Sequence, residues 1–128
     1  LDSTKKEVLY TAGCPEAKLL FQSYLSAINN FEKAVLLQDN LPYTEPPFWY
    51  YPTRQTLGHV LLQSEKPYEA IKTFKKDLED YPKNGWSYYG LYKAYDEIGD
   101  SFNSEKSLNM FENLWEESDI KVSSSIIY

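Results

Sequence analysis

The sequence has very little of the chemistry that holds a small fold together without a large core. Its 128 residues include one cysteine and one histidine, which excludes an intrachain disulfide and a zinc site built from Cys and His ligands. A chain of this length buries about two thirds of its extended surface on folding. We therefore expect a single domain that is stabilised by hydrophobic packing, with no metal and no cofactor.

Long apolar runs and excess positive charge are also missing. No run approaches the roughly 20 apolar residues that span a bilayer, and no segment has the basic start and apolar middle of a signal peptide. The formal net charge is -6, so the overall field repels phosphate backbones and anionic lipid surfaces. The sequence therefore predicts neither a nucleic-acid partner nor a membrane partner.

Two features bear on the origin of the chain. It begins with Leu1 rather than Met, which predicts a processed chain or a fragment of a larger protein. The single cysteine favours a reducing, cytoplasmic compartment over an oxidising one.

Aromatic residues, in contrast, are abundant. They make up 16% of the chain, as 12 Tyr, 6 Phe and 3 Trp. Such large side chains either fill the space between thin elements or form a contact surface. Both roles remain open from composition alone.

A pattern with a period of 34 residues runs through the second half of the chain. Residues 51–84 are answered at this offset by residues 85–118, and within the first unit the apolar positions Ile71, Phe74 and Leu78 are spaced by three and four, as on one face of a helix. Each unit therefore predicts a helix, a turn and a second helix. The first unit has Leu57, Gly58, Leu61, Ala70, Phe74 and Pro82, and the second has Leu91, Tyr92, Tyr95, Ser104 and Leu108.

Proline and capping residues place the helix ends. Proline is tolerated in the first turn of a helix, so Pro52 and Pro67 predict helices over 52–64 and 67–80. The second of these ends before Pro82, because a residue that precedes proline is disfavoured in the helical region.

The second unit has its own boundary signals. Asn84 is a good N-cap for a helix over 85–98, and Gly99 supplies a left-handed C-terminal stop. Ser101 is the predicted N-cap of the last helix. The pattern dissolves after Ser118, which predicts an irregular tail.

Upstream of the repeats the sequence predicts two more helices and one loop. A short helix over 3–12 would end at Gly13, and a long amphipathic helix would run over 15–38. Residues 41–50 are too rich in proline for a helix and are predicted to form a loop.

The first unit resembles the tetratricopeptide repeat. The second unit departs from that family, because Tyr92 stands where the family has Gly and Ser104 stands where it has Ala. The run from Glu45 to Trp86 also resembles the C-terminal part of a group of bacterial tetratricopeptide proteins without an assigned chemistry. The intervals of twelve, four and eight residues match the family at Gly58, Ala70, Phe74 and Pro82.

The resemblance implies an all-α fold of about six helices, in which antiparallel helix pairs stack as a short right-handed superhelix. One such pair cannot bury its apolar stripe alone, so neighbouring pairs must stack. The implied divisions are N-terminal capping helices over 1–40, a proline-rich loop over 41–50, repeats over 51–84 and 85–118, and a tail over 119–128.

In tetratricopeptide proteins the first helix of each pair lines a concave face, and aromatic side chains beside charged ones are common at peptide contacts. The resemblance therefore implies a protein-interaction or scaffold module that binds a peptide or protein segment, without catalysis of its own. The alternative is that the same side chains pack on a neighbouring helix or face water. The implied groove residues are Arg54, Gln55, His59, Leu62, Trp86, Tyr89, Lys93 and Asp96.

Other candidate sites have simpler interpretations. His59 has no partner set that marks a general base or a metal ligand, so we expect it to line the groove or the surface. Cys14 precedes Pro15 at a helix start, where the helix dipole lowers a thiol pKa, but no nucleophile motif surrounds it. We expect Phe48–Tyr51 to seat the proline-rich loop rather than form an adhesive patch. The carboxylates of residues 77–80 are predicted to be a solvated helix surface.

Two other functions remain open. A regulatory or substrate-holding domain of a larger enzyme would present His59 or Cys14 beside a small ligand or a metal. A self-associating structural repeat would instead pair its aromatic face with a second copy of the chain.

Overall fold

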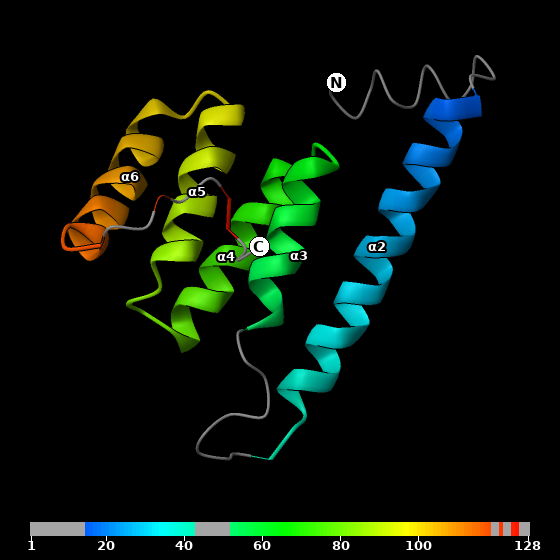
Figure 1. The fold of residues 1–128 in the computed structure, drawn as a ribbon, viewed down its shortest axis with the longest axis horizontal. Coiled ribbons are helices and arrows are strands. Elements are labelled where there is room, and N and C mark those ends of the chain that lie inside the picture. Colours follow the sequence, from blue (N-terminus) through cyan, green and yellow to red (C-terminus); the bar gives the residue numbers. More distant parts are fainter. Residues whose placement is uncertain (1–14, 43–51, 119–120, 122–123, 126–128) are drawn as a thin grey trace.

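The computed structural model describes residues 15–42, 52–118, 121 and 124–125. The described residues form five α-helices and contain no strand, which confirms the predicted all-α class for this part of the chain. The predicted helix over 3–12, Cys14 and Phe48–Tyr51 lie outside the described residues. The helices are α2 (Pro15–Asp39), α3 (Thr53–Gln63), α4 (Pro67–Asp80), α5 (Gly85–Glu97) and α6 (Ser101–Trp115) (Figure 1).

Several helix ends form as the capping signals predicted. The Asn84 side chain accepts hydrogen bonds from the backbone N–H groups of Trp86 at 3.0 Å and Ser87 at 3.4 Å, which satisfies two donors at the start of α5. Pro67 lies in the first turn of α4. Gly99 follows α5 with a φ of 78°, a conformation that glycine adopts without steric cost.

Two predicted positions are wrong by one residue. The N-cap of α6 is Asp100 rather than Ser101, and its carboxylate accepts the backbone N–H of Asn103 at 3.1 Å. Serine and aspartate are similarly good N-caps, so the sequence pattern alone does not distinguish these neighbours. Pro52 is likewise the N-cap of α3 and not a residue of its first turn.

Each helix packs on the next one along the chain. α2 contacts α3, α3 contacts α4, α4 contacts α5, and α5 contacts α6, while α3 also touches α5. Figure 1 shows α3 to α6 side by side and α2 along the other side of α3. Among the described helices, α2 has contacts with α3 alone.

The core is centred on the fully buried ring of Phe74 in α4. Gly58 of α3 and Gly90 of α5 both lie against this ring, and a Cβ atom built on either glycine would lie within the contact radius of the ring carbons. Because neither glycine has a side chain, α3 and α5 both approach α4 closely. The buried apolar residues are Ile28, Leu57, Leu61, Ala70, Ile71, Phe74, Leu91, Ala94 and Tyr95.

Aromatic rings fill the contact between α5 and α6. The ring centroids of Trp86 and Trp115 lie 5.2 Å apart in an edge-to-face arrangement, and those of Tyr89 and Phe111 lie 5.3 Å apart. Phe111 stacks on Trp115 at 5.5 Å. We call Trp86, Tyr89, Phe111 and Trp115 the α5–α6 aromatic cluster.

Candidate functional site

A buried carboxylate joins α3, α4 and α5. Asp77 of α4 is 0% exposed, so the expectation that it belongs to a solvated acidic surface is wrong. Its Oδ2 atom accepts hydrogen bonds from Ser87 Oγ at 2.7 Å and Asn84 Nδ2 at 2.5 Å. Gln55 Nε2 of α3 donates to the same oxygen at 3.4 Å. Three donors from two neighbouring segments therefore converge on one carboxylate oxygen.

Burial raises the pKa of Asp77 above its ordinary value of 3.8, although these hydrogen bonds and the charge of Arg54 act in the opposite direction. The Oδ1 atom is buried and has no hydrogen-bond partner among the described residues. The sequence did contain a signal for this site, because Asp77 follows Phe74 by three residues and so continues the buried stripe of α4.

Arg54 connects three helices rather than facing a pocket. Its guanidinium donates to both carboxylate oxygens of Asp39 in α2, at 2.8 and 2.5 Å, and lies 3.5 Å from the carboxylate of Asp80 in α4. Burial acts to lower the pKa of Arg54, but the hydrogen bond and the charge of Asp39 outweigh it and raise the pKa. The arginine head group is thus engaged within the chain.

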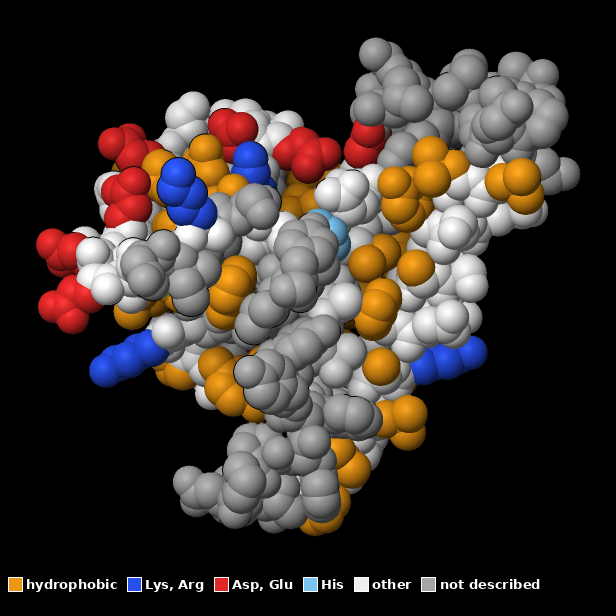
Figure 2. Space-filling view, in the orientation of Figure 1, with side chains coloured by type: hydrophobic (Ala, Val, Ile, Leu, Met, Phe, Trp, Pro, Cys, Tyr) orange, Lys and Arg blue, Asp and Glu red, His pale blue; other side chains and the backbone are white. Residues whose placement is uncertain are grey.

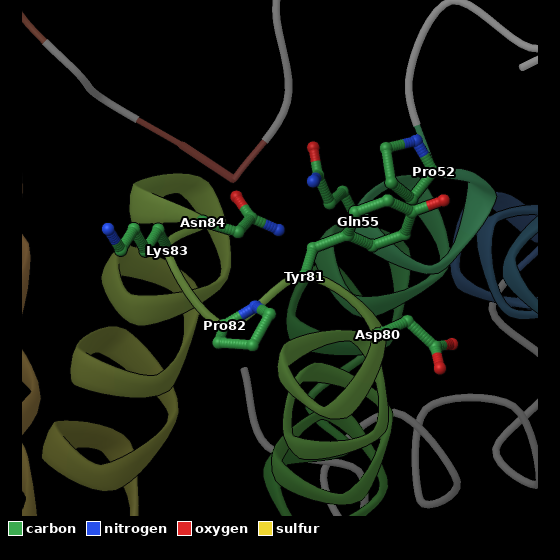
Figure 3. Close-up of a pocket in the computed structure, with 7 residues that line it drawn as sticks. All are labelled: Pro52, Gln55, Asp80, Tyr81, Pro82, Lys83 and Asn84. Atoms are coloured by element: carbon green, nitrogen blue, oxygen red, sulfur yellow. The ribbon is translucent and has the colours of Figure 1, made fainter. Parts of the chain in front are cut away.

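One candidate pocket lies where α4 turns into α5. It has a volume of about 580 Å³ and adjoins the start of α3. Figure 3 shows the Tyr81 ring extending toward Pro52, while Lys83 and Asp80 point outward on opposite sides. Of the predicted groove residues, Gln55 alone lines this pocket. Its lining residues are Pro52, Gln55, Asp80, Tyr81, Pro82, Lys83 and Asn84.

The second pocket lies between α3 and α5, and we call it the α3–α5 pocket. Its volume is about 210 Å³. It brings together four of the eight predicted groove residues, namely His59 and Leu62 of α3 with Tyr89 and Lys93 of α5. The remaining lining residues are Gln63, Gly90, Glu97, Ser124 and Ser125.

The α3–α5 pocket combines an imidazole, an ammonium group and an aromatic ring. Burial lowers the pKa of His59 below its ordinary value of 6.5, so its imidazole is neutral at pH 7. Figure 2 shows this histidine in pale blue on the visible face. Lys93 Nζ lies 6.0 Å from the ring centroid of Tyr89. Leu62 packs against the core cluster beneath.

The C-terminal segment contributes to the same pocket, which the sequence did not predict. Ser125 is 2% exposed, and its Oγ atom donates a hydrogen bond to the backbone carbonyl of Gln55 at 3.3 Å. Ser124 lines the pocket beside it. A short run of serines has no helical or strand periodicity, so the sequence offered no signal that could have placed these residues.

The other predicted groove residues lie elsewhere. Trp86 packs on Trp115 in the α5–α6 aromatic cluster. Asp96 is exposed on α5 and does not line either pocket. Gln55 is buried, with its side chain turned to Asp77. The structure thus divides the predicted groove set between the α3–α5 pocket and contacts within the fold.

The described residues also bear on metal binding and on membranes. They include no group of three or more His, Cys, Asp or Glu side chains that could hold a metal ion. None of the described helices is both long enough and apolar enough to cross a bilayer. Comparisons of the chain with protein-family models, with curated proteins and with solved structures found no match.

Proposed function

We propose that this chain is a protein-interaction module that binds a peptide segment in the α3–α5 pocket. The observation that carries the proposal is the convergence of His59, Leu62, Tyr89 and Lys93 on one hollow from two helices. Side chains of this mixture can pack an apolar group and hydrogen-bond to peptide amides and carboxylates.

We further propose that α3–α4 and α5–α6 form two tetratricopeptide-like antiparallel pairs. The order of helix contacts, with α3 touching both α4 and α5, supports this arrangement. Positions 34 residues apart also have equivalent burial, because Leu57 and Leu91 are both buried, as are Leu61 and Tyr95. In such an arrangement α3 and α5 are the first helices of their pairs, which places the α3–α5 pocket on the face they share.

The size of the pocket favours a peptide over a small metabolite. Pockets that enclose drug-sized ligands measure about 300–1,000 Å³, whereas the α3–α5 pocket measures about 210 Å³. A volume of this size suits one or two side chains of a segment that continues across the surface. The bound segment would then gain affinity from contacts along α3 and α5 rather than from enclosure.

Binding also explains the chemistry of the pocket better than catalysis does. Ser125 donates its one hydroxyl proton to the carbonyl of Gln55, and a carbonyl is too weak a base to activate a serine nucleophile. The alternative of self-association through the aromatic face is disfavoured, because Trp86 and Tyr89 already pack on Trp115 and Phe111 of the same chain.

The proposal can be tested with an array of random-sequence peptides. We expect a subset to bind the wild-type chain. We expect Lys93→Glu and His59→Ala each to weaken those peptides at least about five-fold, because the proposal places both among the minority of interface residues whose loss costs more than about 1 kcal/mol. Lys72→Glu is the matched control, since Lys72 is an exposed lysine of α4 outside both pockets. Equal binding by all four proteins, or no binding by any, would rule out this function.

A further inference from the structure

We propose that the pocket between the α4–α5 turn and the start of α3 binds a neutral, planar aromatic group that carries an N–H donor, such as an indole. We call it the α4–α5 turn pocket. Its volume of about 580 Å³ lies in the range of about 300–1,000 Å³ that is typical of pockets for small ligands. The inference does not depend on the proposed function, because this pocket and the α3–α5 pocket share no described lining residue.

The first support is a carbonyl oxygen in the wall of the pocket. Gln55 is 4% exposed and lines the pocket. Its Nε2 atom donates to the carboxylate of Asp77, so the carbonyl oxygen Oε1 is the atom of this amide that remains for another partner. Among the described residues no donor reaches Oε1, and the atom is not sealed from solvent. An acceptor in a largely buried side chain favours a ligand that brings a donor, because an unpaired acceptor is destabilising.

The second support is that the other amide of the pocket is already engaged. Asn84 Nδ2 donates to Asp77 Oδ2 at 2.5 Å and to Ser87 Oγ at 3.0 Å. Its Oδ1 atom accepts the backbone N–H groups of Trp86 and Ser87. The open acceptor of Gln55 is therefore the main hydrogen-bonding group that the two amides offer to a ligand. An indole matches it, because an indole nitrogen donates one hydrogen bond and accepts none.

The third support is the apolar part of the lining. It consists of the Tyr81 ring and the pyrrolidine rings of Pro52 and Pro82. Figure 3 shows the Tyr81 ring extending toward Pro52, with the Gln55 amide in the same hollow. Tyr81 is 45% exposed, so much of its surface is accessible to a ligand. Aromatic rings pair by offset stacking or edge to face, which favours a planar aromatic body over a branched aliphatic one.

The charges at the rim favour a neutral ligand. Asp80 and Lys83 have opposite charges and point outward on opposite sides of the pocket (Figure 3). The carboxylate of Asp80 also lies 3.5 Å from the guanidinium of Arg54. Neither sign of charge is therefore in excess among the described lining residues, and a ligand gains little from a charge of its own.

Two sources could supply this chemistry, namely a free heterocycle and the tryptophan side chain of a partner protein. The experiment titrates the full, ¹⁵N-labelled chain with indole and follows the amide signals by heteronuclear NMR. We expect shifts of the Gln55 side-chain amide and of the backbone amides of residues 81–84, with a dissociation constant on the order of 1 mM or below. N-acetyltryptophanamide presents the same ring as a peptide does. Binding at least as tight as that of indole would identify a tryptophan side chain as the source, and weaker binding would identify a free heterocycle.

N-methylindole is the matched control ligand, because a methyl group replaces its N–H proton. It should bind at least about five-fold more weakly than indole, since Gln55 Oε1 then remains unpaired. Tyr81→Ala should weaken indole by about two- to ten-fold, through loss of the ring contact. Tyr68→Ala is the matched control variant and should bind like wild type, because Tyr68 is an exposed tyrosine of α4 that does not line the pocket. The amide spectrum of each variant shows directly whether it remains folded.

Three results would overturn the inference. They are equal affinity for indole and N-methylindole, unchanged affinity in the folded Tyr81→Ala chain, and no shift at residues 81–84 with about 5 mM indole. The outcome is also separable from that of the peptide array, because Lys93→Glu should leave indole binding unchanged. Lys93 lines the α3–α5 pocket and not the α4–α5 turn pocket. Loss of indole binding in the folded Lys93→Glu chain would assign the ligand to the α3–α5 pocket and contradict this inference.

Discussion

At the scale of single residues, the contact of Phe74 with two glycines determines how closely three helices approach. A Cβ atom on Gly58 or Gly90 would meet the Phe74 ring, whose position is fixed by burial on all sides. Alanine is the better helix former by about 1 kcal/mol, but overpacking a core typically costs about 1–3 kcal/mol. The steric term should therefore win at both positions.

We predict that Gly90→Ala lowers the free energy of unfolding, measured by urea titration, despite its higher helix propensity. Phe74→Leu should lose packing but make room for the new methyl group, so the double variant should be less destabilised than the sum of the two single variants. Asn109→Ala, at an exposed position of α6, is the control and should change stability by less than about 0.5 kcal/mol. Strict additivity, or a stabilising Gly90→Ala, would contradict the proposed steric contact.

The buried carboxylate of Asp77 makes a prediction about pH. Its pKa is raised above 3.8 in the folded chain, so the folded state holds this proton more tightly than the unfolded state does. The resulting stabilisation is fully present below pH 3.8 and is lost as pH rises through the raised folded pKa. At neutral pH the chain therefore bears the cost of a buried negative charge that acid conditions remove.

Asp77→Asn should remove this dependence. The difference in unfolding free energy between wild type and variant should shift in favour of wild type as pH falls from 7 toward 4, as measured by urea titrations across that range. His59 titrates in part of the same range with the opposite sign, because its pKa is lowered and its stabilisation is lost as pH falls below 6.5. Both proteins should therefore carry His59→Gln. A pH-independent difference would show that Asp77 is not buried as a charge.

At the scale of helices, the α5–α6 aromatic cluster is the principal contact of the last helix. Trp86 meets Trp115 edge to face, and Gly85 lies against the Trp115 ring, where a Cβ atom would come within 2.6 Å. α6 contributes only serines, Ser104 and Ser107, to the buried set of the described residues. Its attachment to α5 therefore depends on partly buried rings rather than on a buried aliphatic stripe.

We predict that Trp86→Ala and Trp115→Ala each destabilise the chain and that their effects are coupled by about 0.5–1.5 kcal/mol, the range for aromatic pairs in double-mutant cycles. Chemical denaturation of the two single variants and the double variant would measure the coupling. A coupling near zero would mean that each tryptophan packs independently. Tyr68, which is an exposed aromatic on α4, offers a control, since Tyr68→Ala should not couple to Trp115→Ala.

The helices were more predictable from sequence than the site, for physical reasons. Pro67, Asn84 and Gly99 act through local backbone geometry, which is encoded within a few residues, and they placed helix ends accurately. The burial of Asp77 depends on donors from two other segments, so no local pattern required it. The position of Ser125 depends on a contact across 70 residues, for which the sequence has no periodic signal.

The position of Trp86 shows the same limit of sequence-based prediction. Helical spacing places Trp86 and Tyr89 on the same side of α5, but it cannot say whether that side meets water, a ligand or another helix. The answer here comes from α6, whose rings Phe111 and Trp115 pack on that side. Lys93, two turns further along α5, extends beyond this contact and remains exposed at the α3–α5 pocket.

At the scale of the whole molecule, stability is distributed unevenly along the row of helices. α2 has 25 residues and α3 has 11, so at 1.5 Å per residue α2 is about 38 Å long against about 17 Å for its single described neighbour. Ile28 is the only described residue of α2 that is buried. Hydrophobic side chains are visible along α2 in Figure 2. The exposed hydrophobic residues of this helix include Leu19, Leu36 and Leu37.

A chain built from consecutive neighbour contacts unfolds cooperatively only as far as those contacts are strong. α3, α4 and α5 share the core around Phe74, whereas α2 adds one buried side chain, Ile28, with the partly buried Phe31 and Val35 packed against the same core. The ion pair of Arg54 with Asp39 and the hydrogen bond from Thr53 N–H to Gln38 Oε1 both involve the last turn of α2. Neither of these two interactions involves the rest of α2. We therefore expect α2 to unfold at a lower free energy of opening than α3 to α6.

Two optical signals can separate these parts of the molecule. Trp86 and Trp115 both report on the α5–α6 contact, and Trp49→Phe removes the third tryptophan of the chain. Far-ultraviolet circular dichroism reports all helices, of which α2 is the longest. In the Trp49→Phe chain, we predict that helicity begins to fall at a lower urea concentration than tryptophan fluorescence changes, because α2 unfolds before the α5–α6 contact is broken. Coincident transitions would instead indicate a single cooperative unit, in which α2 is held as firmly as the helices around Phe74.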